Sequence, residues 1–432
     1  MSLFYGDNFK NNSELNDGES LAYLFTCDEY LIHAKNLVLP SSKAPDNCYR
    51  GMFLGCTSLK SAPALPATDL GTRCYFFMFG GCKSLQTAPL ILPATTLAES
   101  CYESMFGIFE DFTADYYKTE EYANPFKLAY DKQNIIYIIQ NYNDSFNIIV
   151  DNDYSFKALT GCTSLTTAPA LPATTLAKEC YYFMFYKCIS LTTAPELPAT
   201  TLADSCYSNM FDECTSLTTA PALPATTLTN SCYYAMFYNC TSLITAPALP
   251  ATTLADSCYS LMFAYCTSLT AAPALPATTL AKECYSSMFV DCTSLTSVPA
   301  LPATTLTEKC YSAMFYGCTS LTTAPALPAT ILAFRCYANM FNSCTSLTAA
   351  PELPATTLTN SCYADMFNGC SSLNYVKCLA SSLPSGATSS FTLMDWLKGV
   401  SETGTFVKAE NANLPSGSSG IPNGWTVQTV SI

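Results

Sequence analysis

Hydrophobic residues recur at a fixed spacing along most of this chain. In one copy of the pattern, Cys206-Tyr207, Met210-Phe211 and Cys214 are separated by pairs of variable residues, and the next copy begins 26 residues later. The Met-Phe pair of each copy begins at Met52, Met78, Met105, Met184, Met210, Met236, Met262, Met288, Met314, Met340 and Met366. Such a period predicts a solenoid, in which each unit buries its apolar face against its neighbours.

Within one copy the apolar residues fall at i, i+1, i+4, i+5 and i+8. This spacing favours one face of a short helix and does not fit one face of a strand. The residues between them change from copy to copy, as at Ser208-Asn209 and Asp212-Glu213. We therefore expect the cysteine, tyrosine, methionine and phenylalanine side chains to point inward, and the variable pairs to form an outer, solvated face.

The next segment of each copy, residues 216–224 in this one, is rich in threonine and contains two prolines. Because proline lacks the donor that a sheet or a helix needs, a short extended strand ended by a proline turn is predicted. Stacking in register sets Leu217 over Leu243 and Thr219 over Thr245, whereas a slip of one residue would turn every side chain to the other face.

Adjacent threonines recur in this segment, as at Thr192-Thr193. Neighbouring residues of a strand face opposite sides, so only half of the threonines are expected on one surface. The rows are also interrupted, at Ile244 and Ala349. These features favour a structural ladder of hydroxyl groups over a flat ice-binding surface.

The run Met-Phe-Asp-Glu-Cys-Thr-Ser-Leu at residues 210–217, followed by a short strand and a proline, resembles the BspA-like leucine-rich repeat. That family occurs in surface proteins of anaerobic bacteria, in some protists and in phages, and the resemblance extends over roughly residues 48–379. It implies an α/β repeat solenoid, with one short strand and one short helix in each 26-residue unit, and a non-enzymatic role in recognition.

The pattern is interrupted once, because it stops after Phe106 and resumes at Ala158. Two decayed repeats or one insertion could fill this gap, and we favour an insertion. The predicted parts are an N-terminal segment with a degenerate capping repeat (1–47), a first block of repeats (48–105), the insertion (106–158), a second block (159–379) and a C-terminal capping module (380–432).

The insertion has its own pattern. Residues 134–139 and 146–150 are rich in isoleucine and valine and are separated by a polar run, which predicts a β-hairpin. Tyrosine mixed with Asn and Asp is typical of adaptable recognition surfaces. The alternative is a small hairpin that packs its own aromatic side chains on the flank of the solenoid. The candidate recognition residues are Tyr116, Tyr117, Tyr122, Tyr130, Tyr137, Tyr142 and Tyr154.

Charge and cysteine content narrow the class of protein. The net charge of −14 makes nucleic acid and anionic membranes poor partners, and no apolar run is long enough to span a bilayer. The 24 cysteines alternate in steps of 18 and 8. Cysteines eight residues apart on a helix are about 12 Å apart, beyond the roughly 7 Å that a disulfide spans. We therefore expect buried, reduced thiols that act as small apolar groups.

The sequence contains few candidate catalytic residues. His33 is the only histidine, so neither a Ser-His-Asp nor a Cys-His arrangement has a base within the repeats. No metal-binding or cofactor-binding motif is present, and we expect no cofactor. Acid pairs in the insertion, Asp111 with Asp115 and Glu120 with Glu121, could serve a glycosidase, but an acidic surface is the more common explanation.

Both tryptophans lie in the C-terminal module, which resembles the ends of repeat proteins from Bacteroides-type gut bacteria and their phages. Trp396 and Trp425 can cover the last repeat, and the runs 405–407 and 425–427 can add strands. Capping is the expected role of this module.

The N-terminal residues show no secretory signal. The leading hypothesis is a structural and recognition protein of a phage virion, such as a tail or head fibre, which is assembled in a reducing cytoplasm and attaches to a bacterial surface glycan or protein. Other virion proteins or a second copy are further expected partners. The alternatives are a BspA-like adhesin on the bacterial cell surface and an intracellular scaffold that binds a protein.

Overall fold

A computed structural model gives the fold of this chain. It describes residues 21–39, 42–107, 126–131, 134–140, 161–381, 383 and 391–431, with residues 126–131 and 134–140 described by their backbone alone. These residues fall into two compact units, which we describe separately. Unit 1 consists of Met1–Leu197 with Asn209–Thr215, and unit 2 of Pro198–Ser208 with Ser216–Ile432.

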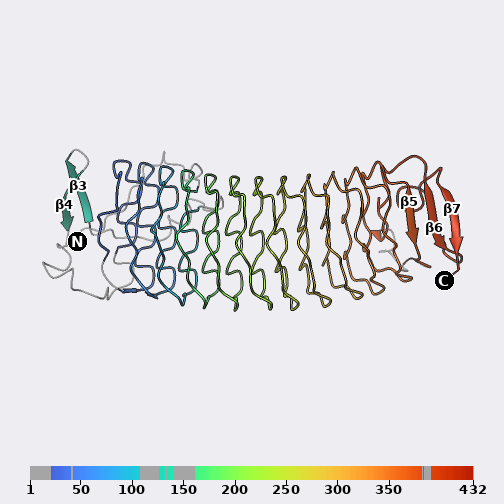
Figure 1. The fold of residues 1–432 in the computed structure, drawn as a ribbon, viewed down its shortest axis with the longest axis horizontal. Coiled ribbons are helices and arrows are strands. Elements are labelled where there is room, and N and C mark those ends of the chain that lie inside the picture. The colour runs from blue at the N-terminus through green and yellow to red at the C-terminus, as the bar shows by residue number, and fades with distance from the viewer. Residues whose placement is uncertain are drawn as a thin grey trace. The chain divides into compact units, whose positions relative to one another are not determined.

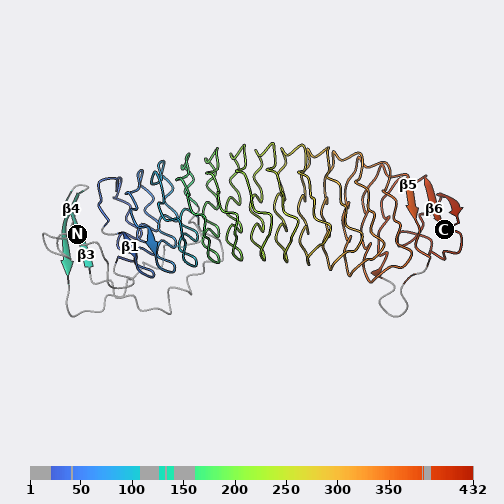
Figure 2. The same cartoon turned by 60° about the horizontal axis from the view of Figure 1, so that its bottom comes forward.

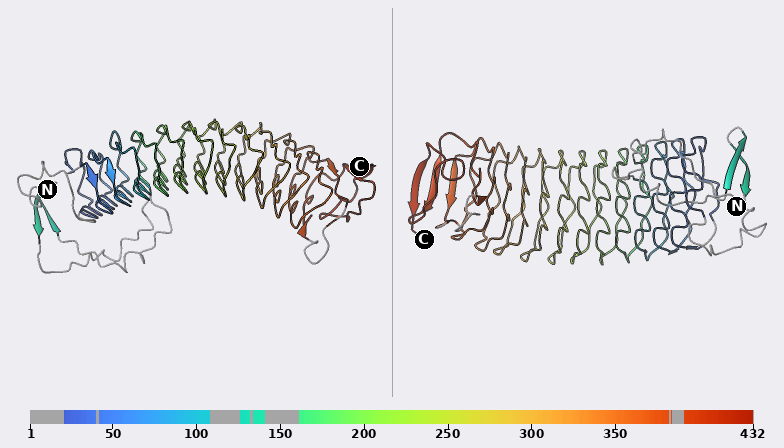
Figure 3. Two further views of the ribbon diagram at one scale, coloured as in Figure 1. Left: turned by 90° about the horizontal axis from the view of Figure 1, so that it is seen from below. Right: turned by 180° about the vertical axis from the view of Figure 1, so that it is seen from behind.

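The described residues form three small sheets. In unit 1, β1 pairs with β2 in parallel (Figures 2 and 3), and β3 pairs with β4 in antiparallel orientation. In unit 2, β5, β6 and β7 form a parallel sheet in that order (Figure 1). The strands are β1 Lys43–Ala44, β2 Asp69–Leu70, β3 Phe126–Asp131, β4 Asn134–Gln140, β5 Tyr375–Cys378, β6 Thr405–Ala409 and β7 Thr426–Val430.

Each repeat has two sides, and the first is a run of turns. We call this the turn side; in one repeat of unit 2 it extends from Asn230 to Cys240. Its backbone amides alternate between two kinds of acceptor. The amide of Tyr233 donates to the carbonyl of Cys258 in the next repeat (3.1 Å), whereas the amide of Tyr234 donates to Ser231 three residues back (3.1 Å). Half of the amides thus close local turns, and half join neighbouring repeats.

The predicted helix is not present, because the described residues contain no α-helix. Every fourth residue of the turn side adopts positive φ: Ser231 at 51°, Ala235 at 49° and Asn239 at 54°. An α-helix would use its amides internally and leave none for the next repeat. Successive four-residue turns also place i, i+1, i+4, i+5 and i+8 on one side, so the hydrophobic spacing fits them as well as it fits a helix.

The other side of each repeat contains the threonines and prolines. We call this the proline side; residues 242–253 form it in one repeat. Isolated parallel bridges such as Thr219↔Thr245 and Thr245↔Ala271 join successive repeats here, which confirms the predicted register. A continuous strand does not form, because the prolines remove donors. Thr218 and Thr219 are both exposed, so the expectation that adjacent threonines face opposite sides is wrong.

The predicted inward residues do form the core. The recurring cysteines, methionines and phenylalanines of the turn side are fully buried, and its tyrosines nearly so. In unit 2, tyrosines stack from Tyr207 to Tyr363 with ring centroids 5.8 to 6.1 Å apart. Phenylalanines stack beside them from Phe237 to Phe367, at 5.5 to 5.7 Å. Successive repeats lie side by side in this unit (Figure 1).

One repeat of unit 1 is divided. The amide of Cys162 donates to the carbonyl of Phe106 (2.9 Å), just as Cys188 donates to Phe185 (3.0 Å) in the next repeat. The rings of Phe106 and Phe185 stack 5.5 Å apart. Gly107 and Gly161 therefore occupy the two variable positions before the second cysteine of a single repeat. Such geometry results from an insertion within one repeat, with residues 108–160 lying between its halves.

The hairpin prediction is confirmed for one of its two strands, and its second strand stays a prediction. Residues 134–139 lie in β4, but β4 pairs with β3, which precedes it. The predicted partner, residues 146–150, lies outside the described residues.

The C-terminal module contains the two strands predicted there. The Trp396 ring is fully buried and stacks on Tyr363 at 6.1 Å, while its Nε1 donates to the carbonyl of Gly420 (2.8 Å). Trp425 donates from Nε1 to the carbonyl of Ser401 (2.8 Å). Both rings cover apolar surface with their polar atoms satisfied, as capping requires.

Candidate binding surfaces

The structure places only two of the seven candidate tyrosines. Tyr130 lies on β3 opposite Ile135, and Tyr137 lies on β4 opposite Ala129, so the strand register does not pair the two. The recognition site predicted for them stays a prediction. The other five, Tyr116, Tyr117, Tyr122, Tyr142 and Tyr154, lie outside the described residues.

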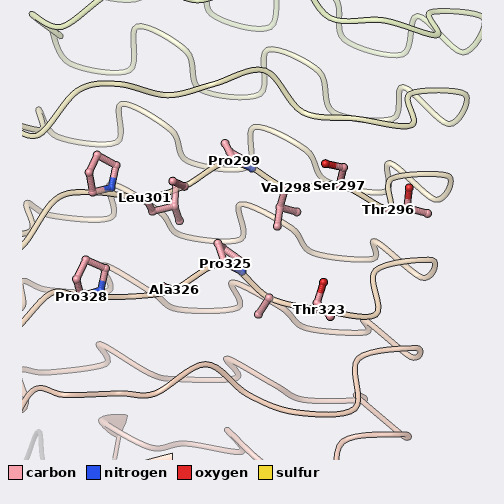
Figure 4. Close-up of a pocket in the computed structure, with 12 residues that line it drawn as sticks. Thr296, Ser297, Val298, Pro299, Leu301, Thr323, Pro325, Ala326 and Pro328 are labelled. Atoms are coloured by element: carbon pink, nitrogen blue, oxygen red, sulfur yellow. The ribbon is translucent and has the colours of Figure 1, made fainter.

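A groove of about 500 Å³ lies on the proline side of unit 2, between two successive repeats (Figure 4). Residues 296–302 form one wall, and the other contains Thr323–Ala326 and Pro328. A smaller groove of about 300 Å³ lies between Ala246–Pro250 and the segment that contains Pro273, Ala274 and Pro276. Neither lining contains a titratable side chain. These grooves offer small apolar and hydroxyl groups, which suit contact binding and supply no acid or base.

Asp212, on the turn side of unit 1, departs from the predicted solvated face. Ser208, Asn209 and Asp212 are only 2%, 8% and 7% exposed. Burial raises the pKa of Asp212 to about 7, although Asn209 Nδ2 donates to its Oδ2 (2.9 Å) and opposes the shift. These side chains are short, so they lie close to the backbone turns, where little water reaches them. The prediction of an outer face therefore fails in this repeat.

Glu103 is a second buried acid in unit 1. It is 7% exposed, and burial raises its pKa to about 7, while the nearby Ser100 and the charge of Arg73 act in the opposite direction. Raised carboxyl pKa values can mark catalytic acids, but neither Glu103 nor Asp212 lines the two grooves. The acid pairs predicted from sequence, Asp111 with Asp115 and Glu120 with Glu121, lie outside the described residues.

None of the 24 cysteines, all of which are described, forms a disulfide, and all except Cys27 are buried, as the sequence predicted for their packing. The Cys266 thiol donates to the carbonyl of Phe237 (3.1 Å), and burial raises its pKa to about 12. A thiol with so high a pKa is a poor nucleophile. His33 bridges to Ser61 on the proline side, and its Nδ1 lies 3.1 Å from Ser61 Oγ.

The described residues offer neither a metal site nor a membrane-spanning helix. Among the described residues, no group of three or more potential ligands could hold a metal ion. In the same part of the chain, no helix has the length and hydropathy to cross a membrane.

A third hollow, of about 350 Å³, lies on the turn side of unit 2 and was not predicted from the sequence. Its lining includes Phe334, Arg335 and Phe391, and the two phenylalanines are 40% and 49% exposed. A signal was available, because Phe334 stands two residues before a recurring cysteine. Every other complete repeat has a polar residue there.

The stacked repeats and their two kinds of side define a leucine-rich-repeat solenoid. The family model for the BspA type leucine rich repeat region matches in six copies, over residues 139–270, 178–322 and 260–394. The chain belongs to this family, whose repeats typically form non-enzymatic binding scaffolds.

Other comparisons add less. No curated protein matches this chain. Among solved structures, one described as "Crystal structure of TLR13-ssRNA13 complex" is similar, with 13% sequence identity and a TM-score of 0.29. The match covers 81% of this chain and 46% of that one, so the chain spans less than half the length of that protein.

Proposed function

We propose that this chain is a non-enzymatic recognition protein that attaches to a bacterial surface. The observation that carries this proposal is the contrast between core and surface. The buried residues are nearly identical in every repeat, whereas exposed turn positions hold side chains as different as Tyr265 and Phe334. Such an arrangement keeps a rigid scaffold while its surface varies, as the binding repeats of this family do.

A narrower proposal is that the protein belongs to a phage virion, as part of a tail or head fibre. The likeness of the C-terminal module to phage-encoded repeat proteins supports it. The buried free thiols also support it, because a virion is assembled in a reducing cytoplasm. The second candidate is a cell-surface adhesin, and the match to the BspA-type repeat supports that reading.

Within this function, we assign recognition to the tyrosine-rich segment between Gly107 and Gly161. Its composition supports this assignment, because tyrosine supplies large contact area at low entropic cost. Its expected ligand is a surface glycan or protein of the bacterium, and other virion proteins or a second copy of the chain are further proposed partners.

The experiment compares the full chain with a variant that lacks residues 108–160, in binding to intact gut-anaerobe cells and to their isolated surface glycans. Joining Gly107 to Gly161 restores the eight-residue spacing from Cys101 to Cys162. The hydrogen bond from Cys162 to Phe106 is then expected to survive, and circular dichroism and thermal unfolding check that the repeats remain folded.

Binding by the full chain and loss of binding in the folded variant would support the proposal that this segment recognises the surface. Equal binding by both would place recognition on the repeats or on the C-terminal module. No binding by either protein would contradict attachment to these surfaces. Gold-labelled antibodies on purified phage particles and on bacterial cells would then separate the virion from the adhesin.

A further inference from the structure

The third hollow, which we call the Phe334 hollow, lies entirely among described residues of unit 2. Its lining comes from four successive levels of the turn side. The lining residues are Lys309, Ser312, Phe334, Arg335, Ala338, Asn339, Asn360, Ser361, Ala364, Asp365, Phe391 and Met394. Its volume of about 350 Å³ falls at the lower end of the range for small-ligand sites.

Phe334 breaks a column of polar residues. Two residues before the first cysteine, the other repeats have Asp46, Thr72, Glu99, Lys178, Asp204, Asn230, Asp256, Lys282, Glu308 and Asn360. Several of these side chains support the stack, since Asp204 accepts a hydrogen bond from the amide of Asn230 (3.0 Å) and Asp256 from that of Lys282 (3.0 Å). Phenylalanine has no acceptor, so stacking of the repeats does not account for Phe334.

Burial does not account for the apolar wall of the hollow either. Phe334, Phe391 and Met394 are 40%, 49% and 38% exposed, whereas the floor is made of the small, buried Ala338 and Ala364. Large apolar groups that remain exposed around a concave site are a feature of ligand-binding sites.

Polar groups surround this wall, and one cation stands out. The Arg335 guanidinium lies 5.3 Å from the centroid of the Phe334 ring, and no carboxylate among the described residues pairs with it. Lys309, by contrast, contacts Glu283 through its Nζ at 2.7 Å. Asp365 accepts a hydrogen bond from Asn368 Nδ2 (3.0 Å) and places a carboxylate at another edge.

We propose that the Phe334 hollow binds a sugar residue that carries a carboxylate. This inference rests on the proposed function, because it names a class of surface ligand. A pyranose ring presents a face of C–H groups that can pack on Phe334 and Phe391. Its carboxylate matches the forked donors of Arg335, which form strong charge-assisted hydrogen bonds. Asn339, Asn360 and Asp365 offer hydrogen-bonding groups to ring hydroxyls.

The test uses the full chain and two matched pairs of probes in titration calorimetry. The first pair is an α-1,4-linked galacturonic acid trimer and the corresponding galactose trimer, which differ only in the carboxylates. The second pair is sialyllactose and lactose. The hollow is expected to bind the acidic member of at least one pair at least tenfold more tightly than the neutral member.

The variants are Phe334→Asn and Arg335→Ser. Each introduces the residue that the next repeat has at the same position, Asn360 or Ser361, so both variants are expected to fold. The matched control is Ile331→Thr, because Ile331 is 59% exposed in the same repeat but does not line the hollow, and Thr305 holds that position one repeat earlier.

Binding of the acidic probe should weaken at least tenfold in F334N and in R335S and stay unchanged in I331T. The inference is overturned if neither acidic probe binds, if each acidic probe binds no better than its neutral partner, or if F334N and R335S bind like the parent. Cell binding separates this failure from that of the proposed function. If the full chain and F334N attach to cells equally well while the acidic probes fail, the inference is wrong and the recognition role stands.

Discussion

The two sides of a repeat in unit 2 contact the neighbouring repeats in different ways. On the turn side, every second amide donates to the next repeat, and the tyrosine and phenylalanine rings form continuous stacks. On the proline side, isolated bridges such as Thr219↔Thr245 join the repeats, and several residues of each repeat remain exposed. The comparison indicates that most of the contacts that hold successive repeats together lie on the turn side.

The contrast also shows where surface can vary. The proline side keeps nearly the same residues in every repeat, exposed residues included, while the outer positions of the turn side change from repeat to repeat. A strongly bonded backbone with a buried apolar face tolerates such change, although some of the variable side chains, such as Asp204 and Asp256, also accept hydrogen bonds from the next repeat. Recognition is therefore expected on the side that also holds the repeats together.

The largest expected effect is on the turn side. Phe263 is fully buried and stacks between Phe237 (5.6 Å) and Phe289 (5.7 Å). Phe263→Ala should lower the free energy of unfolding by about 3–5 kcal/mol, measured by urea unfolding followed by circular dichroism. The control is Ile244→Thr on the proline side, where Ile244 is 53% exposed and the change should stay within about 0.5 kcal/mol. Similar losses in both variants would remove the distinction between the two sides.

An intermediate effect depends on pH. The pKa of Asp212 is about 7 in the folded protein, against an ordinary value of 3.8. Between these pH values the folded state retains a proton that the unfolded state has released. The free energy of unfolding therefore falls as pH rises from about 4 to about 7, and the contribution of Asp212 to this fall is about 2–4 kcal/mol.

Asp212→Asn tests this contribution, because an amide cannot ionise and its oxygen can still accept the hydrogen bond of Asn209. Thermal unfolding at several pH values should show a shallower loss of stability in the variant between pH 4 and 7. The matched variant Glu103→Gln should remove a comparable part of the slope, since the pKa of Glu103 is also about 7. An unchanged slope in D212N would contradict the raised pKa.

The smallest expected effect concerns the turns themselves. Gly317 has a φ of +69°, and a Cβ at this position would clash with Asp291. Gly317→Ala should destabilise the protein by about 1–2 kcal/mol, because positive φ disfavours residues with a Cβ. Ala313→Gly is the opposite control: Ala313 has a φ of 52°, and glycine there should be neutral or stabilising. Chemical unfolding measures both, and a stable G317A variant would show that the turns tolerate side chains without strain.

The repeat period and the register could be predicted from the sequence, and so could the inward residues, because identical residues recur at every level of the stack. The turns could not. Eight residues are too few to separate a period of 3.6 from a period of four, and the residues with positive φ are as varied as Glu283, Ser287 and Asp291. No glycine or asparagine column marks these positions, so the usual signal of a left-handed residue is missing.

The binding surfaces were predicted less well for a related reason. The repeats make recurring residues easy to recognise within one chain, whereas a binding surface is marked by a residue that departs from its column. Phe334 indicates the hollow because the ten other repeats have a polar residue at its position. The pairing of β4 with β3 was not predicted, because composition does not say which neighbouring segment pairs with a strand.

The divided repeat of unit 1 depends on two glycines and one backbone hydrogen bond. Gly107 and Gly161 pass close to the next repeat, where a Cβ on Gly107 would lie 2.5 Å from the carbonyl oxygen of Phe183 and one on Gly161 would clash with Tyr186. The fold thus demands two glycines and the hydrogen bond between Cys162 and Phe106. The stack of repeats in unit 1 therefore continues across the break in the sequence, because these few described residues make the contacts that an undivided repeat makes.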